Sequence, residues 1–120
     1  MKKINLIILL SLLFTGCVTA SGKGQKAEEA YKVCAKLITA IEEYKLKNHK
    51  YPRSLDDLTP NFIKSYPKLI HRFPITFTSS KSDGLPPEQP YILGFQYVEF
   101  GLNSCKYLPT QNEWDCYGAL

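Results

Sequence analysis

Four cysteines, two histidines and one pair of adjacent aspartates are the side chains of this sequence that could do chemistry. A cysteine beside a histidine could act as a nucleophile, and two close carboxylates could divide acid and base roles. Cys34 is the thiol to consider, but no spacing places His49 or His71 beside it. Asp56 and Asp57 lie where a short helical turn would begin, and helix capping explains them. We therefore expect no catalytic residue.

Motifs for metals, nucleotides and activated serines are also missing from the sequence. No His/Cys spacing suits zinc, and neither a phosphate-binding glycine loop nor a nucleophile-elbow pattern occurs. We expect no metal, no cofactor and no enzymatic activity. One alternative stays open, a small-ligand or hydrolytic function in a cleft between a helix and a sheet. A pocket that held Cys34 with a histidine would favour it.

The N-terminus has the features of an export signal. Lys2 and Lys3 form a positive start, and residues 6–14 form an apolar run broken only by Ser11. The run is far shorter than the ~20 residues that span a bilayer. We therefore interpret residues 1–16 as a cleavable signal peptide and not as a transmembrane helix.

The sequence Leu-Phe-Thr-Gly-Cys that ends at Cys17 resembles the lipobox of bacterial lipoproteins. The resemblance implies cleavage before Cys17, fatty acylation of this residue and anchoring in a membrane, where two or three acyl chains hold a protein stably. Val18 in place of aspartate implies the outer membrane rather than the inner one. Residues 17–26 then form the lipidated cysteine and a flexible tether, because they are small, polar and rich in glycine.

Residues 27–48 show a sustained helical period. Apolar side chains recur at steps of three and four, and charged residues take the opposite side. We expect Asn48 to supply a left-handed stop. Beyond it, Ser54 and Asp57 form a capping-box pattern, which predicts a short helical turn over residues 55–58.

The segment AIEEYKLKNHKYPRSLDDL resembles the region that follows the long helix in type IV pilins and type II secretion pseudopilins. The matching residues are Ile41, Tyr44, Tyr51, Pro52, Leu55 and Leu58. The resemblance implies a headpiece in which one helix packs on an antiparallel sheet. The chain departs from pilins upstream, where a lipobox cysteine replaces the long apolar half-helix.

The C-terminal half reads as strands. Alternation of apolar and polar residues predicts strands over residues 73–78 and 91–100. The exposed loop at 79–90 that joins them is expected to be a mobile connection, with contact to a partner as the alternative. A turn at 109–112 pairs Tyr107 with Trp114, Lys106 with Asp115 and Cys105 with Cys116. Since this single register gives an aromatic, a charge and a cysteine pair on alternating faces, we predict a Cys105–Cys116 disulfide.

Length and charge complete the prediction. The 120 residues suit one domain. The chain has 15 basic and 11 acidic residues, and removal of Lys2 and Lys3 with the signal peptide would leave 13 basic residues against 11 acidic ones. This excess of positive charge is too small to indicate nucleic-acid binding. We expect one α+β domain over residues 27–120, with a long N-terminal helix packed on a small antiparallel sheet. The predicted function is that of a small exported lipoprotein with a non-catalytic, pilin-like interaction domain facing the periplasm. It would bind an envelope protein, alternatively as an assembly factor of a secretion or pilus system.

Overall fold

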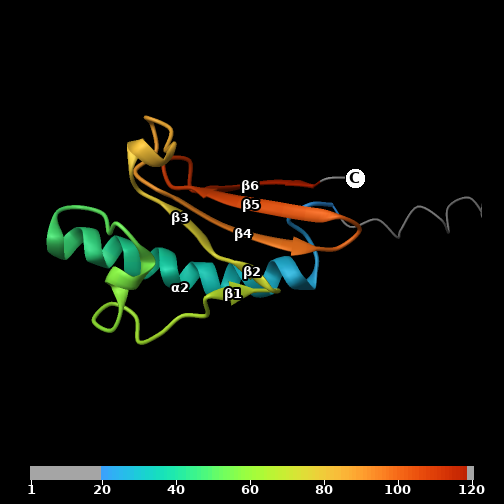
Figure 1. Ribbon diagram of the computed structural model, residues 1–120, viewed down its shortest axis with the longest axis horizontal. Coiled ribbons are helices and arrows are strands. Elements are labelled where there is room, and N and C mark those ends of the chain that lie inside the picture. Colours follow the sequence, from blue (N-terminus) through green and yellow to red (C-terminus); the bar gives the residue numbers. More distant parts are fainter. Residues whose placement is uncertain (1–19, 119–120) are drawn as a thin grey trace, which may run out of the picture.

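The computed structural model describes residues 20–118, which form one α+β domain. The long helix α2 (Gln25–Asn48) packs on a four-stranded antiparallel sheet, with strands in the order β3-β4-β5-β6 (Figure 1). The strands are β3 (Thr76–Thr78), β4 (Ile92–Val98), β5 (Leu102–Leu108) and β6 (Glu113–Gly118). The predicted fold class, one long helix on a small antiparallel sheet, is therefore confirmed.

Helix α2 owes its position to one apolar stripe. Its buried residues follow steps of three and four except for the adjacent Ala40 and Ile41. They are Ala27, Ala30, Cys34, Leu37, Ala40 and Ile41. The helix starts two residues before the predicted residue 27. The predicted stop is wrong by one position, because His49 and not Asn48 adopts the left-handed conformation, with φ 60°. The His49 N–H then bonds to the Lys45 carbonyl and satisfies it.

The short helix η1 (Leu55–Leu58) follows the capping-box prediction. The Ser54 side chain accepts from the backbone of Asp57, and the Asp57 carboxylate accepts from the Ser54 N–H at 3.3 Å. The box satisfies N–H groups that the first turn of a helix leaves without partners. It thereby aims Leu55 and Leu58, which are both buried, at α2.

The strand predicted over residues 73–78 is divided in two. β2 (Phe73–Pro74) pairs with β1 (Leu69–Ile70) in a separate two-stranded ribbon, whereas β3 joins the main sheet. Pro74 has no N–H to donate, and the Ile75 N–H bonds to the Lys68 carbonyl at 3.3 Å. The chain therefore changes partners at Ile75.

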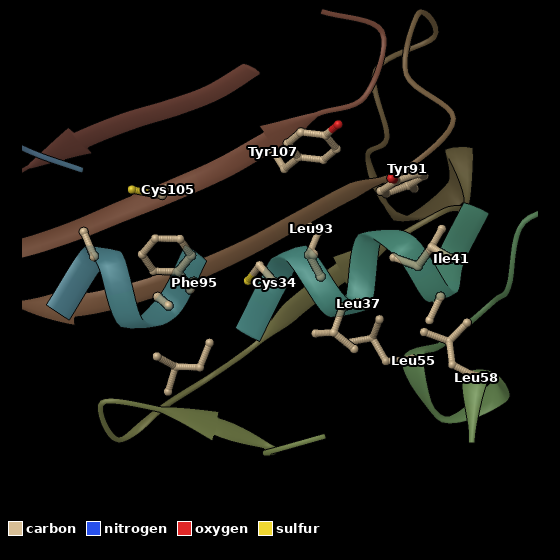
Figure 2. Close-up of a cluster of buried hydrophobic side chains, with 14 of the residues drawn as sticks. Cys34, Leu37, Ile41, Leu55, Leu58, Tyr91, Leu93, Phe95, Cys105 and Tyr107 are labelled. Carbon is tan, nitrogen blue, oxygen red and sulfur yellow. The ribbon is translucent and has the colours of Figure 1, made fainter. Parts of the chain in front are cut away.

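The core lies between the sheet, α2 and η1. Figure 2 shows Leu93, Phe95 and Tyr91 from β4 and the segment before it on one side of α2, with Leu55 and Leu58 on another. Leu37 and Ile41 are 0% exposed between these two layers, so this helix is covered on more than one side. Burying a leucine or isoleucine side chain contributes roughly 1.5–3 kcal/mol, so this stripe is a main source of stability.

The chain's entry into the domain differs from the expected flexible tether. Residues 20–23 form a turn closed by the Lys23 N–H and the Ala20 carbonyl at 3.0 Å, and residues 25 and 26 belong to α2. The Ser21 hydroxyl donates to Asn103 Oδ1 at 2.8 Å. Within the described residues, the segment assigned to the tether is thus attached to the sheet.

Candidate functional site

The C-terminal hairpin forms in the predicted register. Tyr107 faces Trp114, Lys106 faces Asp115 and Cys105 faces Cys116. The two cysteines are bonded as a disulfide with their Cα atoms 4.1 Å apart. The predicted staple is therefore confirmed, and it links strands β5 and β6.

The disulfide lies against the entry of the chain. The Tyr31 hydroxyl donates to the Gly22 carbonyl at 2.9 Å and lies 3.3 Å from Cys116 Sγ. The Gly22 N–H donates to the Tyr97 hydroxyl at 2.8 Å in a buried position. A Cβ at Gly22 would lie 2.6 Å from Cys116 Sγ, so no other residue fits there without movement. The staple, α2 and the entry turn form one packed unit.

Aromatic rings surround this unit. Tyr31 lies 5.0 Å from Trp114 and 5.3 Å from Phe95 between ring centroids, and Phe95 lies 5.2 Å from Trp114. These tilted and edge-on contacts are the geometry that aromatic pairs prefer. They fill the space between α2 and the sheet near the disulfide, so this region is core and not a cleft.

Cys34 has the surroundings of an inert thiol. It is 0% exposed on the core stripe of α2. Burial raises the pKa of the Cys34 thiol to about 12, so the nucleophilic thiolate is suppressed at neutral pH. Neither histidine accompanies it. His71 Nε2 bonds to the Lys26 carbonyl at 2.9 Å, and His49 is at the far end of α2.

The adjacent aspartates serve separate structural roles. Asp57 caps η1, whereas Asp56 accepts a hydrogen bond from the Tyr66 hydroxyl at 2.7 Å and pairs with Lys68. The Lys68 ammonium, then the Tyr66 hydroxyl, lower the pKa of the Asp56 carboxyl. The Asp56 carboxyl is therefore ionised at neutral pH. The two aspartates have different partners and are not arranged as an acid–base pair.

Residues 20–118 contain neither a metal-binding cluster nor a membrane-spanning helix. In that part of the chain, no three His, Cys, Asp or Glu side chains gather closely enough to hold a metal ion. No helix there is long and apolar enough to cross a bilayer. Cys17, which the lipobox resemblance marks for acylation, and the predicted signal peptide over residues 1–16 lie outside the described residues.

The loop at 79–90 borders an open groove. It contains the short helix η2 (Lys81–Asp83) and is anchored by the buried Gln89, whose amide donates to Gln111 Oε1 at 2.7 Å. The open groove has a volume of about 720 Å³. Its charged lining residues are Lys50, Arg53, Lys81 and Asp83. It is an open, mainly cationic surface, and Cys34 is not one of its lining residues.

Comparisons with known proteins add no relative. No family model, curated protein or solved structure matches this chain. Any function must therefore be argued from the residues and their geometry.

Two features escaped the sequence analysis. One is the attachment of Ser21 and Gly22, because a glycine-containing polar segment has the same composition in a tight turn as in a free tether. The other is that β6 lies at the edge of the sheet. Strand order depends on contacts between distant segments, and no local pattern in residues 113–118 reports it.

Proposed function

We propose that this chain is a small lipoprotein of a bacterial cell envelope, with a non-catalytic, pilin-like domain that binds an envelope protein. The membrane anchor would be the acylated Cys17, preferentially in the outer membrane and facing the periplasm. The lipobox resemblance supports the anchor, and the Cys105–Cys116 disulfide supports an oxidising compartment. The arrangement of one helix on an antiparallel sheet agrees with what the pilin resemblance implies.

The unpaired edge of β6 carries the binding role. The Cα separation of 4.1 Å marks Cys105 and Cys116 as a pair that exchanges no backbone hydrogen bonds. Such pairs alternate along an antiparallel ladder, so Trp114 and Gly118 are of the same type. The backbone N–H and C=O groups of Trp114, Cys116 and Gly118 therefore point away from β5. Within residues 20–118, no hydrogen bond outside the sheet uses them.

This edge lacks most of the usual protection against added strands. Proteins shield edges with charged side chains, lysine above all, and with prolines, bulges or very short strands. β6 is six residues long, keeps a regular register and contains neither proline nor lysine. Its Tyr117 side chain is 53% exposed. These features suit an extended partner segment that adds to the sheet through its backbone.

The charges of β6 indicate the composition of that segment. Glu113 and Asp115 are exposed on the face opposite Trp114 and Cys116. Opposite charges on facing strands stabilise pairing, so basic residues at alternate positions of the partner would fit. An assembly component of a secretion or pilus system is one partner of this kind.

The alternative of small-ligand binding has one candidate place. The groove beside the 79–90 loop presents Lys50, Arg53 and Lys81 together, which suits an anionic ligand. The hydrolytic form of this alternative has no support from Cys34, which is buried away from both histidines. We therefore place the strand-addition function first.

Site-specific photo-crosslinking in intact cells tests the binding role. A photoreactive residue at Tyr117 or Asp115 should trap one and the same envelope protein, whereas the exposed Lys36 on α2 serves as the control position. Equal adducts at all three positions would contradict edge binding.

A second experiment tests the anchor. Cys17→Ser should abolish the incorporation of labelled fatty acid and release the protein from the membrane fraction. Unchanged labelling and fractionation would contradict acylation at Cys17.

A further inference from the structure

The turn between β4 and β5 exposes three apolar side chains. Val98 is 51%, Phe100 69% and Leu102 41% exposed, and we refer to these residues as the apolar tip. The turn lies at the end of the sheet where the chain enters the domain (Figure 1). Most other large apolar side chains of the described chain are at least partly buried in the core.

Phe100 occupies a backbone conformation that does not suit it. Its φ is 55°, a left-handed value that asparagine and glycine adopt readily and that a bulky residue rarely does. The strain is not offset within the domain, because the side chain remains mostly in solvent. A strained residue that gains so little from folding indicates a role outside the fold.

The apolar tip is tied to the entry of the chain. Asn103 Oδ1 accepts from the Ser21 hydroxyl, and its amide donates to the carbonyls of Glu99 and Gly101 at 3.0 and 3.2 Å. Cys17 precedes Ala20 by three residues, which can span at most about 10 Å. An acyl group on Cys17 would therefore hold this end of the domain at the lipid surface.

Cationic side chains flank the tip. Lys26 Nζ donates to the Val98 carbonyl at 2.7 Å, and Lys26 and Arg72 line a groove of about 600 Å³ beside it. Carboxylates are also present, namely Glu99 in the turn and Glu29, which lies 3.6 Å from His71 Nε2. Apolar side chains next to lysine and arginine are typical of surfaces that lie in the headgroup region of a bilayer.

From these observations we infer that the apolar tip inserts into the phospholipid surface to which Cys17 is anchored, with Lys26 and Arg72 at the phosphates. This inference rests on the anchor proposed above. It adds a second contact with the membrane beside the acyl chains and thereby sets the orientation of the domain. The domain stands end-on, and the opposite end, with the last turn of α2 and the 79–90 loop, points away from the membrane (Figure 1).

Depth-dependent fluorescence quenching tests this orientation. The lipidated protein is reconstituted into vesicles of phosphatidylethanolamine and phosphatidylglycerol with brominated acyl chains. Two variants add a tryptophan, Phe100→Trp at the tip and Leu46→Trp near the opposite end. Leu46 is the matched control because it is 78% exposed. The wild-type emission of Trp114 is subtracted.

We expect quenching of the added emission to be at least about two-fold stronger for Phe100→Trp. Equal quenching in two variants that both sediment with the vesicles would overturn the inference and leave the anchor standing. Failure of both to sediment would overturn the anchor and the inference together. As a check on the strain argument, Phe100→Asn should raise the unfolding temperature. A lowered temperature would show that Phe100 serves the fold and would overturn the argument.

Discussion

Replacing Gly22 with alanine should detach the entry of the chain from the domain. Gly22 has φ 81°, which an alanine adopts only with strain. The new Cβ would lie 2.6 Å from Cys116 Sγ and 2.9 Å from the Tyr31 hydroxyl. The disulfide fixes Cys116 in place, so the entry turn and not the sheet would move.

The size of the effect follows from the contacts that detachment breaks. They are three hydrogen bonds of 2.8 to 2.9 Å, from Ser21 to Asn103, from Gly22 to Tyr97 and from Tyr31 to Gly22. Each hydrogen bond contributes about 1 kcal/mol. The free energy of unfolding should therefore fall by about 2–3 kcal/mol and no further, because detachment also relieves the strain at residue 22. For a domain of this size, that loss lowers the unfolding temperature by roughly 10–20 °C.

Gly84→Ala is the matched control. Gly84 has nearly the same backbone angle, φ 86°, but nothing lies within 4 Å of the Cβ that would be added. The variant Gly84→Ala should therefore lose only the free energy of unfolding that backbone strain removes, about 1 kcal/mol. The difference between the two variants isolates the close contact at Gly22.

Thermal unfolding and amide hydrogen exchange together measure the effect. The Gly22 N–H is bonded to Tyr97 in a buried position and should exchange slowly in the wild type. In Gly22→Ala, this amide should exchange fast while the strands of the sheet stay protected. If Gly22→Ala unfolds no lower than Gly84→Ala and keeps a slow amide at position 22, the attachment of the entry turn is refuted.

Three further predictions concern the core and the cysteines. Replacing both Cys105 and Cys116 with alanine opens a loop with a sequence separation of 11. The free energy of unfolding, measured in urea, should fall by about 3 kcal/mol. A variant as stable as the oxidised wild type would contradict this. Leu37→Ala should lower the free energy of unfolding by about 2–5 kcal/mol, because Leu37 is 0% exposed. Leu46 lies on the same helix but is 78% exposed, so Leu46→Ala should change it by no more than about 0.5 kcal/mol. Similar losses in the two variants would disprove the assigned core face. The pKa of Cys34 is about 12 in the fold and near 9.0 when unfolded, so the folded state keeps a proton that the unfolded state releases. Stability should thus decline from about pH 9 upward. Between about pH 8 and pH 10 the wild type should lose more stability than Cys34→Ala, which keeps only the smaller decline from tyrosines such as Tyr31 and Tyr91, whose pKa is also raised.

Local patterns predicted a large part of the fold. The 3.6-residue period of α2 and the capping box of η1 involve neighbours within a few residues, and both formed as expected. The hairpin register was predicted from three cross-strand pairs that agree with one another, among them Cys105 and Cys116, and the structure has this register. Such features depend on interactions within one element or across one turn, which a single sequence displays directly.

Two local predictions were wrong, the unbroken strand over residues 73–78 and the helix stop at Asn48. The split at Ile75 arose because Lys68, outside the predicted strand, offers the better partner for the Ile75 N–H. The helix stop moved from Asn48 to His49, although asparagine has the stronger left-handed preference.

Cys34 was expected to be an inert buried thiol, and its exposure of 0% agrees with that.

The sequence by itself determined the one-helix α+β class, the register of the C-terminal hairpin and its disulfide, since each follows from periodicity or pairing over short distances. It also supplied the lipobox resemblance, which implies acylation of Cys17. Only the tertiary structure decided that Ser21 and Gly22 attach to the sheet, that β6 is an open edge and that Phe100 projects beside the entry of the chain. These features arise from contacts across 75 or more residues or from the order of strands, and local pattern carries no information about either.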